Sequence, residues 1–571
     1  MRKALIFCVI LFHGFSVQLN AQSIVTTKHN LSVSGPGTVK ATGETEICIF
    51  CHAPHNSRPL APLWNRSDPG LNYTLYTSST LQALPGQPDG SSLLCLSCHD
   101  GTVALGSVIS RTTPITMATG TFIPAGITNL STNLRYDHPI SFDYTSALAT
   151  SDGQLKDPVN ITAPVSLKNG RMQCTSCHDP HKDVYSSNFL VTPSPNSNLC
   201  NSCHQRTYWT ASTHNTSAKT WNGTLSNPWP FTYPAMTTVA QNGCESCHNP
   251  HNSGGNVLNL KYQAEESNCM DCHNGNVAAK NIATQLAKTY KHNVAGYIGV
   301  HDANEPSKVT SMHVECVDCH NPHASNAATA TAPAVNGFLA GVKGVDQSGA
   351  AVSTAANSYE ICYRCHAGSS GSAPSSTARV ISQNNTQLEF ASGNPSFHPV
   401  AVARNNTEVT TNLIAPNSAS TIIYCTSCHA SDGAGAPAGP HGSIYPQILK
   451  LQYITTDGAR SSNGTVESAA AYALCYSCHN RTNILASSAS NTFSYHSLHI
   501  VSQRAPCNTC HDPHGISSTQ GTAANNSNLI NFRTGIVTPS SGGIIRFTDT
   551  GLRHGSCTLT CHGQDHNPKT Y

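Results

Sequence analysis

Cysteine and histidine are the residues of this chain whose number and spacing point to chemistry. The sequence holds 25 Cys and 30 His in 571 residues, and charged residues make up only 11%, against about 25% in an ordinary soluble protein. Eleven segments read Cys-x-x-Cys-His, and a twelfth has one extra residue between its cysteines. Numbered one to twelve along the chain, they are Cys48/Cys51/His52, Cys95/Cys98/His99, Cys174/Cys177/His178, Cys200/Cys203/His204, Cys244/Cys247/His248, Cys269/Cys272/His273, Cys316/Cys319/His320, Cys362/Cys365/His366, Cys425/Cys428/His429, Cys475/Cys478/His479, Cys507/Cys510/His511 and Cys557/Cys561/His562.

This spacing is the one that covalent attachment of haem requires. Residues three and four positions apart share one face of a helical turn, so both thiols can reach the two vinyl groups of one haem edge. The adjacent His then becomes the proximal ligand of the iron. Structural zinc has no need of a His after every second Cys, and a disulfide framework gives no reason for it either. The sequence therefore predicts twelve covalently bound copies of haem c, with the twelfth motif bulging around its extra residue.

The second axial ligand of each iron is predicted to be a histidine. Only five Met follow the first residue, whereas seventeen His lie outside the motifs and beyond residue 21. Because Met raises the potential of a haem, a set of bis-His irons should have comparatively low potentials. The distal ligands that we expect are His29, His55, His138, His181, His214, His251, His313, His323, His398, His441, His499 and His514. His292 and His301 are alternatives to His313, and His496 is an alternative to His499; His554 and His566 flank the last motif and could ligate it or bridge to another subunit.

The order of the motifs indicates six pairs. Motifs one, three, five, seven and eleven continue as His-x-Pro-His, and motif nine reaches Pro440-His441 after an insertion. Repeats of this kind are typical of stacked arrays. The second His of such a motif cannot bind its own iron, because the free coordination position is on the opposite ring face and the Pro discourages further helix. We therefore assign these six histidines to the even-numbered haem of each pair, and the histidines upstream of each pair to the odd-numbered haem.

The N-terminus predicts export. Arg2 and Lys3 precede an apolar run that ends in Leu19-Asn20-Ala21, which is the layout of a secretory signal peptide over residues 1–21. We expect no membrane span in the rest of the chain. Without the signal peptide, 29 Lys and Arg balance 29 Asp and Glu, so no basic patch suggests nucleic acid. Haem propionates would make the protein anionic, which favours basic partners or metal cations.

The expected fold is mostly irregular, with short α-helices and little β-structure. Twelve haems in 571 residues leave little need for a conventional core, so we expect an elongated chain wrapped around a row of porphyrins. A short helical turn should lie at every motif, and residues 282–290 could form a helix. The six haem-pair modules are expected at residues 22–130, 131–212, 213–290, 291–385, 386–485 and 486–571.

Three stretches near the N-terminus resemble the opening module of a known family. They are Ile-Cys-Ile-Phe-Cys-His-Ala-Pro-His-Asn at 47–56, Leu-Trp-Asn-Arg at 63–66 and Leu-Leu-Cys-Leu-Ser-Cys-His-Asp-Gly at 93–101. Together with the repeated His-x-Pro-His pattern, they are similar to the doubled-CxxCH multihaem c-type cytochromes of metal-reducing and related anaerobic bacteria. The resemblance covers nearly all of the chain beyond residue 21, mostly through the motifs. It implies bis-His haems and extracytoplasmic electron transfer.

Three functions compete for this pattern. The first is an electron conduit in the periplasm or on the outer cell surface, with redox proteins or extracellular acceptors as partners and with self-assembly into a filament as an option. The second is an enzyme, such as a multihaem nitrite or hydroxylamine oxidoreductase, which needs one haem that is open to substrate. No motif replaces its His by Lys, and the spare histidines outnumber the irons. The third, haem storage, gains nothing from ligands that tie neighbouring haems together. We therefore expect an electron carrier without catalytic residues.

Overall fold

The structure is a computed structural model, and it describes residues 23–58, 61, 63–185, 188–229, 236–254, 257–297, 299, 301–311, 313–369, 377–404, 412–457, 466–487 and 492–571. The predicted signal peptide, residues 1–21, lies outside the described residues. Among the helices of the described chain, none is long and apolar enough to cross a membrane. The chain divides into two compact units. The first comprises Met1–Tyr76, Ala83–Ala149 and Lys156–Ser194, and the second comprises Thr77–Gln82, Thr150–Leu155 and Pro195–Tyr571.

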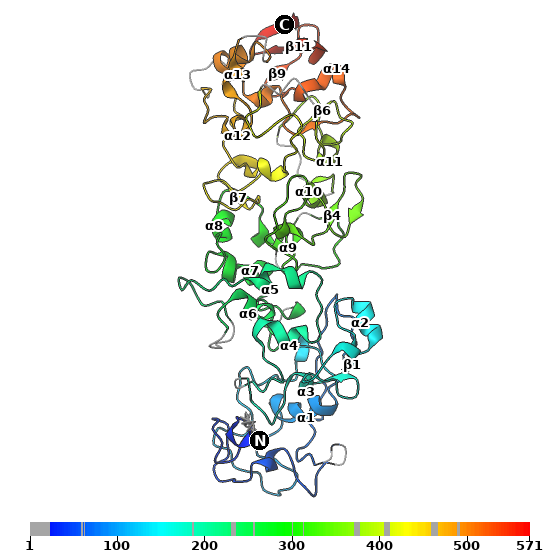
Figure 1. Ribbon diagram of the computed structural model, residues 1–571, viewed down its shortest axis with the longest axis vertical. Helices are drawn as coiled ribbons and strands as arrows, with labels where there is room; N and C mark the ends of the chain where they lie inside the picture. The colour runs from blue at the N-terminus through cyan, green and yellow to red at the C-terminus, as the bar shows by residue number, and fades with distance from the viewer. Residues whose placement is uncertain are drawn as a thin grey trace, which may run out of the picture. The chain divides into compact units, whose positions relative to one another are not determined.

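Helices are short throughout the described chain (Figure 1). The longest described α-helix is α1, with ten residues from Gly90 to His99. The other α-helices are α2 (Ser146–Asp152), α3 (Cys174–Cys177), α4 (Asn198–Asn201), α5 (Thr213–Thr216), α6 (Val239–Asn242), α7 (Glu265–His273), α8 (Ile282–Leu286), α9 (Cys316–Cys319), α10 (Ser358–His366), α11 (Thr386–Glu389), α12 (Ala473–Tyr476), α13 (Arg481–Leu485) and α14 (Ala523–Asn526). The 3-10 turns are η1 (Ile24–Thr26), η2 (Cys48–Phe50), η3 (Leu134–Tyr136), η4 (Pro158–Asn160), η5 (Pro195–Ser197), η6 (Trp209–Ala211), η7 (Cys244–Ser246), η8 (Val257–Asn259), η9 (Val294–Gly296), η10 (Gly337–Leu339), η12 (Cys425–Ser427), η13 (Pro446–Ile448), η15 (Cys507–Thr509) and η16 (Ser527–Leu529), and the segment η14 (Ser497–Ser502) is a π-helix.

The helical turns lie where the attachment motifs are. The first cysteine of each of motifs one to eleven falls in a described helix or 3-10 turn, as the spacing predicts. In α3, for example, the backbone N–H of His178 donates to the carbonyl of Cys174 over 3.0 Å, which brings both thiols to one side. The helix expected over residues 282–290 is shorter than predicted, because α8 ends at Leu286 and Tyr290 pairs with Ser443.

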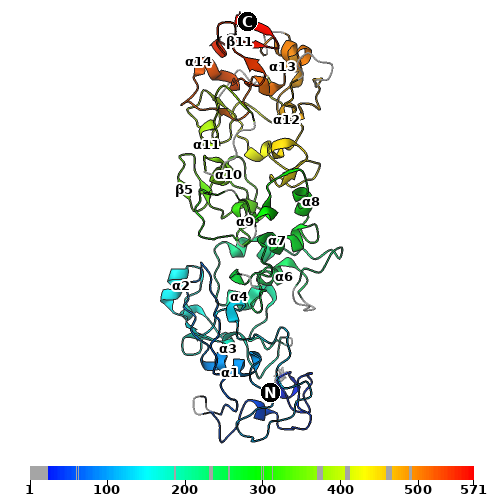
Figure 2. The same ribbon diagram turned by 180° about the vertical axis from the view of Figure 1, so that it is seen from behind.

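Strands are few and mostly two residues long. They are β1 (Phe142–Asp143), β2 (Arg171–Met172), β3 (Tyr290–Lys291), β4 (Gly344–Val345), β5 (Ala351–Val352), β6 (Ser396–Phe397), β7 (Gly442–Ser443), β8 (Gly515–Ile516), β9 (Val537–Thr538), β10 (Arg546–Gly551), β11 (His554–Cys561) and β12 (Gln564–Thr570). The last four form one antiparallel sheet in the order β10-β11-β12, with β9 also paired to β11. This sheet lies with α13 and α14 beside the C-terminus in both views (Figures 1 and 2). Short helices, little sheet and a mostly irregular chain are the predicted fold class, and it is confirmed.

The twelfth motif departs from the predicted helical turn. Cys557 and Cys561 both lie on β11, and Leu559 between them is buried with Val537 and Phe547. The extra residue places the two cysteines an even number of positions apart. A spacing of four would fit one face of a helix as well, but here the two cysteines share a face of a strand. The expected helical turn at this motif is therefore wrong.

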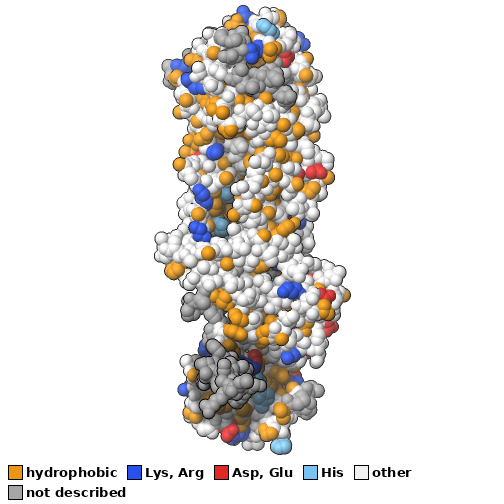
Figure 3. All heavy atoms as spheres, in the orientation of Figure 1, with side chains coloured by type: hydrophobic (Ala, Val, Ile, Leu, Met, Phe, Trp, Pro, Cys, Tyr) orange, Lys and Arg blue, Asp and Glu red, His pale blue; other side chains and the backbone are white. Residues whose placement is uncertain are grey.

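The apolar core is divided into small clusters beside the attachment cysteines. One cluster contains Tyr363 and Phe390 and packs against Cys425, and another contains Tyr472 and Ile500 and packs against Cys507. Charged side chains appear only as scattered spots on the face drawn in Figure 3, as expected from a content of 11%. These two clusters therefore adjoin positions at which haem edges would be attached.

Candidate haem sites

Histidine rings face one another in pairs across a nearly constant gap. A metal–imidazole bond is about 2 Å long, and the ring centre lies about 1 Å beyond the nitrogen, so two imidazoles on opposite sides of one iron should have centres about 6 Å apart. Among the described residues, nine pairs have ring centroids 6.0–6.4 Å apart. They are His52–His181, His29–His99, His248–His323, His214–His273, His320–His441, His429–His514, His398–His479, His496–His511 and His499–His566. The spacing fits two axial imidazoles on one haem iron.

The pairing order is the reverse of the one expected from the sequence. The His-x-Pro-His histidine His323 faces His248 of motif five, not His366 of motif eight. His441 likewise faces His320 of motif seven, and His514 faces His429 of motif nine. In the first unit, His181 faces His52 of motif one. Each of these histidines therefore reaches the odd-numbered motif two places earlier in the chain, and the predicted assignment to even-numbered haems is wrong for all four.

Three upstream histidines face even-numbered motifs, where odd-numbered ones were expected, whereas His496 faces His511 of motif eleven, the odd-numbered motif for which it was an alternative. His29 faces His99 of motif two, within the first unit. His214 faces His273 of motif six, and His398 faces His479 of motif ten. These three histidines are among the predicted distal ligands, but each faces the histidine of a different motif from the one expected.

Motif four does not have the axial pair that the sequence predicts. We assigned His181 to the iron of this motif, opposite His204, but His181 faces His52 of motif one. One imidazole offers one Nε2 to a metal, so the expected pair of His204 with His181 is wrong. His204 itself is exposed, and its backbone forms a bridge with Leu155. Its role as the proximal ligand of motif four stays a prediction.

The two cysteines of motif four also differ from the expected arrangement. Cys200 lies in α4, whereas Cys203 follows the end of that helix at Asn201. The N–H groups of Cys203 and His204 still donate to the Cys200 carbonyl, over 3.1 Å and 2.9 Å. Cys203 is only 8% exposed and belongs to the apolar core, while the other described motif cysteines are half-buried or exposed. Cys203 is therefore the buried thiol among the described motif cysteines, and a haem edge there would have to lie within the core.

The proline of His-x-Pro-His explains the observed connection. The Nδ1–H of His29 donates to the carbonyl of Pro180 over 3.0 Å, and the next residue, His181, faces His52. The Nδ1–H of His214 donates in the same way to Pro322 over 2.8 Å. A Pro-His step therefore holds two distal histidines at once, one through the Pro carbonyl and one through the His side chain. The same arrangement recurs where Pro513 accepts from His398 and Pro440 accepts from His292.

Backbone carbonyls fix the tautomer of the proximal histidines. The Nδ1–H groups of His248, His320 and His429 donate to the carbonyls of Leu258, Phe338 and Gln447 over 2.8–2.9 Å. A carbonyl can only accept, so the proton is on Nδ1 and the Nε2 lone pair is free to bind a metal. These bonds set both the orientation and the donor atom of each ring.

Burial keeps these imidazoles neutral. Desolvation, followed by the neighbouring His214, lowers the pKa of His273 to about 4. Desolvation also lowers the pKa of His323 to about 3 and that of His441 to about 4. Only the neutral ring can coordinate iron, so the protein holds these side chains in the form that a ligand requires at neutral pH.

The ring planes of the nine pairs fall into three groups. The planes of His248 and His323 lie 11° apart, those of His320 and His441 lie 7° apart, and the pair at motif one is similar at 17°. The pairs at motifs two, six and ten are steeply inclined, at 59°, 71° and 66°. The pairs at motifs nine and eleven and the pair of His499 and His566 are intermediate, at 50°, 44° and 42°.

The cysteines of successive motifs adjoin one another within each unit. The first cysteine of an even-numbered motif hydrogen-bonds to the first cysteine of the next motif. These thiol pairs are Cys95–Cys174, Cys200–Cys244, Cys269–Cys316, Cys362–Cys425 and Cys475–Cys507. In five motifs of odd number, the second cysteine lies so close to a cysteine of the following even-numbered motif that the charge of one thiolate raises the pKa of the other thiol. These pairs are Cys51–Cys98, Cys247–Cys272, Cys319–Cys362, Cys428–Cys478 and Cys510–Cys557. The attachment points therefore follow the order of the motifs, three in the first unit and nine in the second.

At motif eight, the nearest spare histidine is not the one we selected. The charge of His292 contributes to the lowered pKa of His366, after desolvation. His292 also bonds to the Pro440 carbonyl, as the distal histidines of other even-numbered motifs do. His313 instead places its Nε2 2.8 Å from Oε1 of Glu305. His292, expected as an alternative to His313 for motif seven, therefore lies beside motif eight, for which His323 was expected.

Motif nine has a carboxylate behind its distal histidine. Nδ1 of His514 lies 3.1 Å from Oε2 of Glu389, whose side chain is 7% exposed. Burial lowers the pKa of His514, but the Glu389 carboxylate outweighs burial and raises it overall. A carboxylate in this position makes the imidazole a stronger electron donor. Glu389 has no motif around it, and sequence reasoning missed it.

The proximal histidine of motif twelve points elsewhere. His562 sits in the turn between β11 and β12 with φ 51°, and its Nε2 lies 2.9 Å from Oδ1 of Asp457. The ring that does stand opposite another imidazole is that of His566, 6.4 Å from His499. His499 is one of the expected distal ligands, and His566 is one of the two histidines expected either to ligate the last motif or to bridge to another subunit. His496 faces His511 of motif eleven.

The remaining predicted distal histidines have local contacts. Nδ1 of His138 donates to the carbonyl of Pro139 over 2.9 Å. The backbone N–H of His251 donates to Oδ1 of Asn249 over 3.4 Å. His55 is exposed.

Two segments of the chain match a known protein family. The family model described as the doubled CXXCH motif matches residues 166–207 and 237–278. The chain carries the doubled CXXCH motif of multihaem c-type cytochromes. The predicted family is thereby confirmed, and the motifs indicate covalently bound haem c. No curated protein matches the chain significantly.

Proposed function

We propose that this multihaem cytochrome is an exported electron carrier with twelve bis-His haems, one for each motif. Haem c supplies one-electron redox chemistry when it is bound at these positions. The observation that carries the proposal is the combination of histidine pairs 6.0–6.4 Å apart with cysteines that adjoin from one motif to the next. Cysteines that touch bring successive porphyrin edges together, and closely spaced haems favour electron transfer along the chain.

The histidines favour a carrier over an enzyme. A nitrite or hydroxylamine oxidoreductase would need one iron with a position open to substrate, whereas eight of the nine described pairs already join a motif histidine to a second imidazole. For the twelfth haem, we propose attachment through Cys557 and Cys561 and ligation by His499 and His566. That iron would be six-coordinate as well.

The partners and the place of action follow from export. A signal peptide over residues 1–21 would deliver the chain to the periplasm or the outer cell surface. Redox proteins would then be its donors, and extracellular or outer-membrane acceptors would receive the electrons. Comparing the haem-stained protein in periplasmic, membrane and culture-medium fractions tests this part of the proposal, and retention in the cytoplasm would contradict it.

Self-assembly is supported by His55. In four cases the histidine of a Pro-His step faces the histidine of another motif, and His55 stands in the same kind of step in motif one. His55 is exposed, and we propose that it contacts a second copy of the chain. Electron microscopy of the native protein should show filaments that a His55→Ala variant does not form, whereas dispersed monomers in both samples would contradict assembly.

Counting haems and their spin states tests the main proposal. A pyridine haemochrome assay and the intact mass should agree on twelve haems for the processed chain, and eleven would point to motif twelve as unmodified. All irons should be low-spin. A sizeable high-spin ferric signal, or rapid binding of carbon monoxide by the untreated reduced protein, would instead favour the enzyme.

A further inference from the structure

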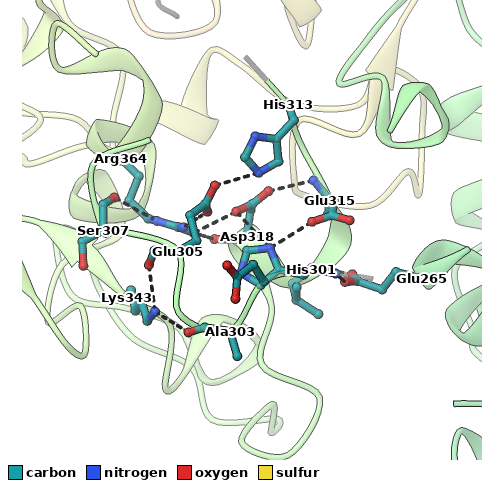
Figure 4. A network of polar contacts seen from close by, with 12 residues as sticks. Glu265, His301, Ala303, Glu305, Ser307, His313, Glu315, Asp318, Lys343 and Arg364 are labelled. Carbon is teal, nitrogen blue, oxygen red and sulfur yellow. Dashed lines mark hydrogen bonds and ion pairs between the residues drawn. The ribbon is translucent and has the colours of Figure 1, made fainter. Parts of the chain in front are cut away.

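Two histidines outside the haem pairs, His301 and His313, lie among buried carboxylates beside motif seven (Figure 4). Nδ1 of His301 is 2.9 Å from Oε2 of Glu315 and 3.9 Å from Oδ1 of Asp318. One donor atom from each of His301, His313, Glu315 and Asp318 can be chosen so that all four lie within 4.8 Å of one another. Imidazole nitrogens and carboxylate oxygens therefore converge on one point.

The fold holds these donors in place. Glu315 and Asp318 form the capping box of α9, in which each side chain bonds to the backbone N–H of the other residue. The Glu315 and Asp318 side chains are 4% and 6% exposed, and those of His301 and His313 are 14% and 11% exposed. The two carboxylates are thus held in place and almost fully buried, whereas the two imidazoles remain partly exposed to solvent.

Negative charge exceeds positive charge at this point. Four carboxylates meet here, from Glu265, Glu305, Glu315 and Asp318. Arg364 pairs with Glu305 over 2.9 Å and with Oδ1 of Asp318 over 3.1 Å. The ammonium group of Lys343 donates to the backbone carbonyls of Ala303 and Glu305 and not to these carboxylates.

Arg364 therefore pairs with only two of the four carboxylates, and Oδ1 of Asp318 lies in its ion pair with Arg364 without accepting a hydrogen bond. Buried carboxylates need a compensating cation. Burial and the neighbouring Glu265 raise the pKa of Glu315 to about 8, and burial lowers the pKa of His301. Both groups are thus pushed toward their uncharged forms, which a bound cation would reverse for the carboxylate.

The geometry points to a site for one divalent first-row transition-metal ion, held by His301, His313, Glu315 and Asp318. Mixed imidazole and carboxylate donors suit Zn²⁺ and its neighbours in that series. Bonds of about 2.1 Å would set tetrahedral donor atoms about 3.4 Å apart, so the side chains would draw in by roughly 1 Å. A surface cavity of about 160 Å³, lined by His301, Asp302 and Ser79 among others, offers a way in.

Zinc uptake by the haem-loaded protein tests this inference. Protein treated with a chelator and dialysed against micromolar Zn²⁺ should retain one zinc per chain by elemental mass spectrometry. His301→Ala and Glu315→Gln should each weaken zinc binding at least tenfold. Glu315→Gln keeps an oxygen for the cap of α9, so it remains informative if His301→Ala folds poorly. An unchanged haem spectrum reports folding, and it keeps this test separate from the proposed electron transfer.

Two matched variants control for adventitious zinc. His554→Ala removes an exposed histidine, and Glu266→Gln removes a carboxylate next to the buried Glu265. Both should bind zinc like the wild type. Because Glu315 and Asp318 flank Cys316, bound zinc should also raise the potential of one haem in the wild type but not in Glu315→Gln. The inference is overturned if the wild type retains no stoichiometric zinc, or if a folded His301→Ala or Glu315→Gln variant binds it as tightly.

Discussion

His248 and His323 face each other with ring centroids 6.2 Å apart and planes 11° apart, although the two residues belong to different motifs. His248 is the motif histidine of Cys244 and Cys247, whereas His323 follows Cys316 and Cys319. An iron between these rings would tie the two attachment segments together. The same connection between motifs two places apart recurs at His320 and His441 and at His429 and His514. Ligand bonds would thus link parts of a chain whose apolar clusters are small.

Replacing His323 by Ala should convert one iron, that of motif five, from low-spin to high-spin. Cys244, Cys247 and His248 remain, so the haem should stay attached. Electron paramagnetic resonance and resonance Raman spectra would count the altered irons. A double variant with His248→Ala locates the iron: it should still show one altered haem. Two altered haems would mean that His323 serves a different iron.

The ring orientations predict two classes of low-spin haem. Parallel imidazole planes, as at His320 and His441 with 7°, split the iron d orbitals differently from steeply inclined planes, as at His214 and His273 with 71°. The paramagnetic resonance spectrum of the oxidised protein should therefore contain a rhombic low-spin component and a component with one very large g value. A single homogeneous class would contradict the alternation of ring orientations.

The haem positions were predictable because attachment chemistry fixes their spacing. Two vinyl groups and one iron require Cys, Cys and His at set intervals, whatever the rest of the chain does. The pairing order was not predictable, because it depends on a backbone atom. The carbonyl of Pro322 holds His214 over 2.8 Å, and a carbonyl is present at every residue. Because motif eight is the next motif in the sequence, we assigned His323 to its haem. In the fold, the segment of His323 instead turns back toward His248 of motif five.

The C-terminal motif shows a second limit. Counting residues suggested that a helical turn could absorb the extra residue between Cys557 and Cys561. The strand instead gains the burial of Leu559 and its pairing with β10 and β12. Tertiary packing of this kind overrides local spacing. The contact of Glu389 with His514 could not be predicted either, because the two residues are far apart in the sequence.

Arg66 should be important for the stability of the first unit. Its side chain is fully buried and donates to the carbonyls of Ser97, Ala104 and Leu105. Arg66→Met would leave these three acceptors unsatisfied, at about 1–3 kcal/mol for each buried group, so we expect a loss of at least about 3 kcal/mol in the free energy of unfolding. Arg111→Met is the control, because Arg111 is 48% exposed in its pair with Glu44 and should cost about 0–1 kcal/mol. Denaturant titration would compare them, and equal losses would contradict the role given to Arg66.

Glu389→Gln should raise the potential of one haem, that of motif nine. The carboxylate lies 3.1 Å from Nδ1 of His514 and makes that ring a better donor to the oxidised iron. A neutral amide loses this effect, so one couple should move upward in a spectroelectrochemical titration. Glu360→Gln is a matched control, since Glu360 is equally buried but bonds to the N–H of Ala356 and to Asn357. Identical titrations of Glu389→Gln and the wild type would show that the carboxylate does not tune this haem.

The last motif gives opposite expectations for its two histidines. His566 stands 6.4 Å from His499, at the distance of an axial pair. Nε2 of His562 instead lies 2.9 Å and 3.0 Å from the two carboxylate oxygens of Asp457. A carboxylate can only accept a hydrogen bond, so the proton is on Nε2 of His562 and that nitrogen has no lone pair for iron. His566→Ala should therefore turn one iron high-spin, while His562→Ala should leave every iron low-spin.

Mass spectrometry of both variants shows whether the haem is still attached through Cys557 and Cys561, which separates loss of a ligand from loss of the cofactor. Asp457→Asn adds a third comparison. It should free the His562 ring without changing the spin state of the irons, because His499 and His566 would still hold the haem. If His562→Ala gives the high-spin iron and His566→Ala does not, the motif histidine is the ligand after all. In that case the extra residue between the cysteines has no effect on ligation.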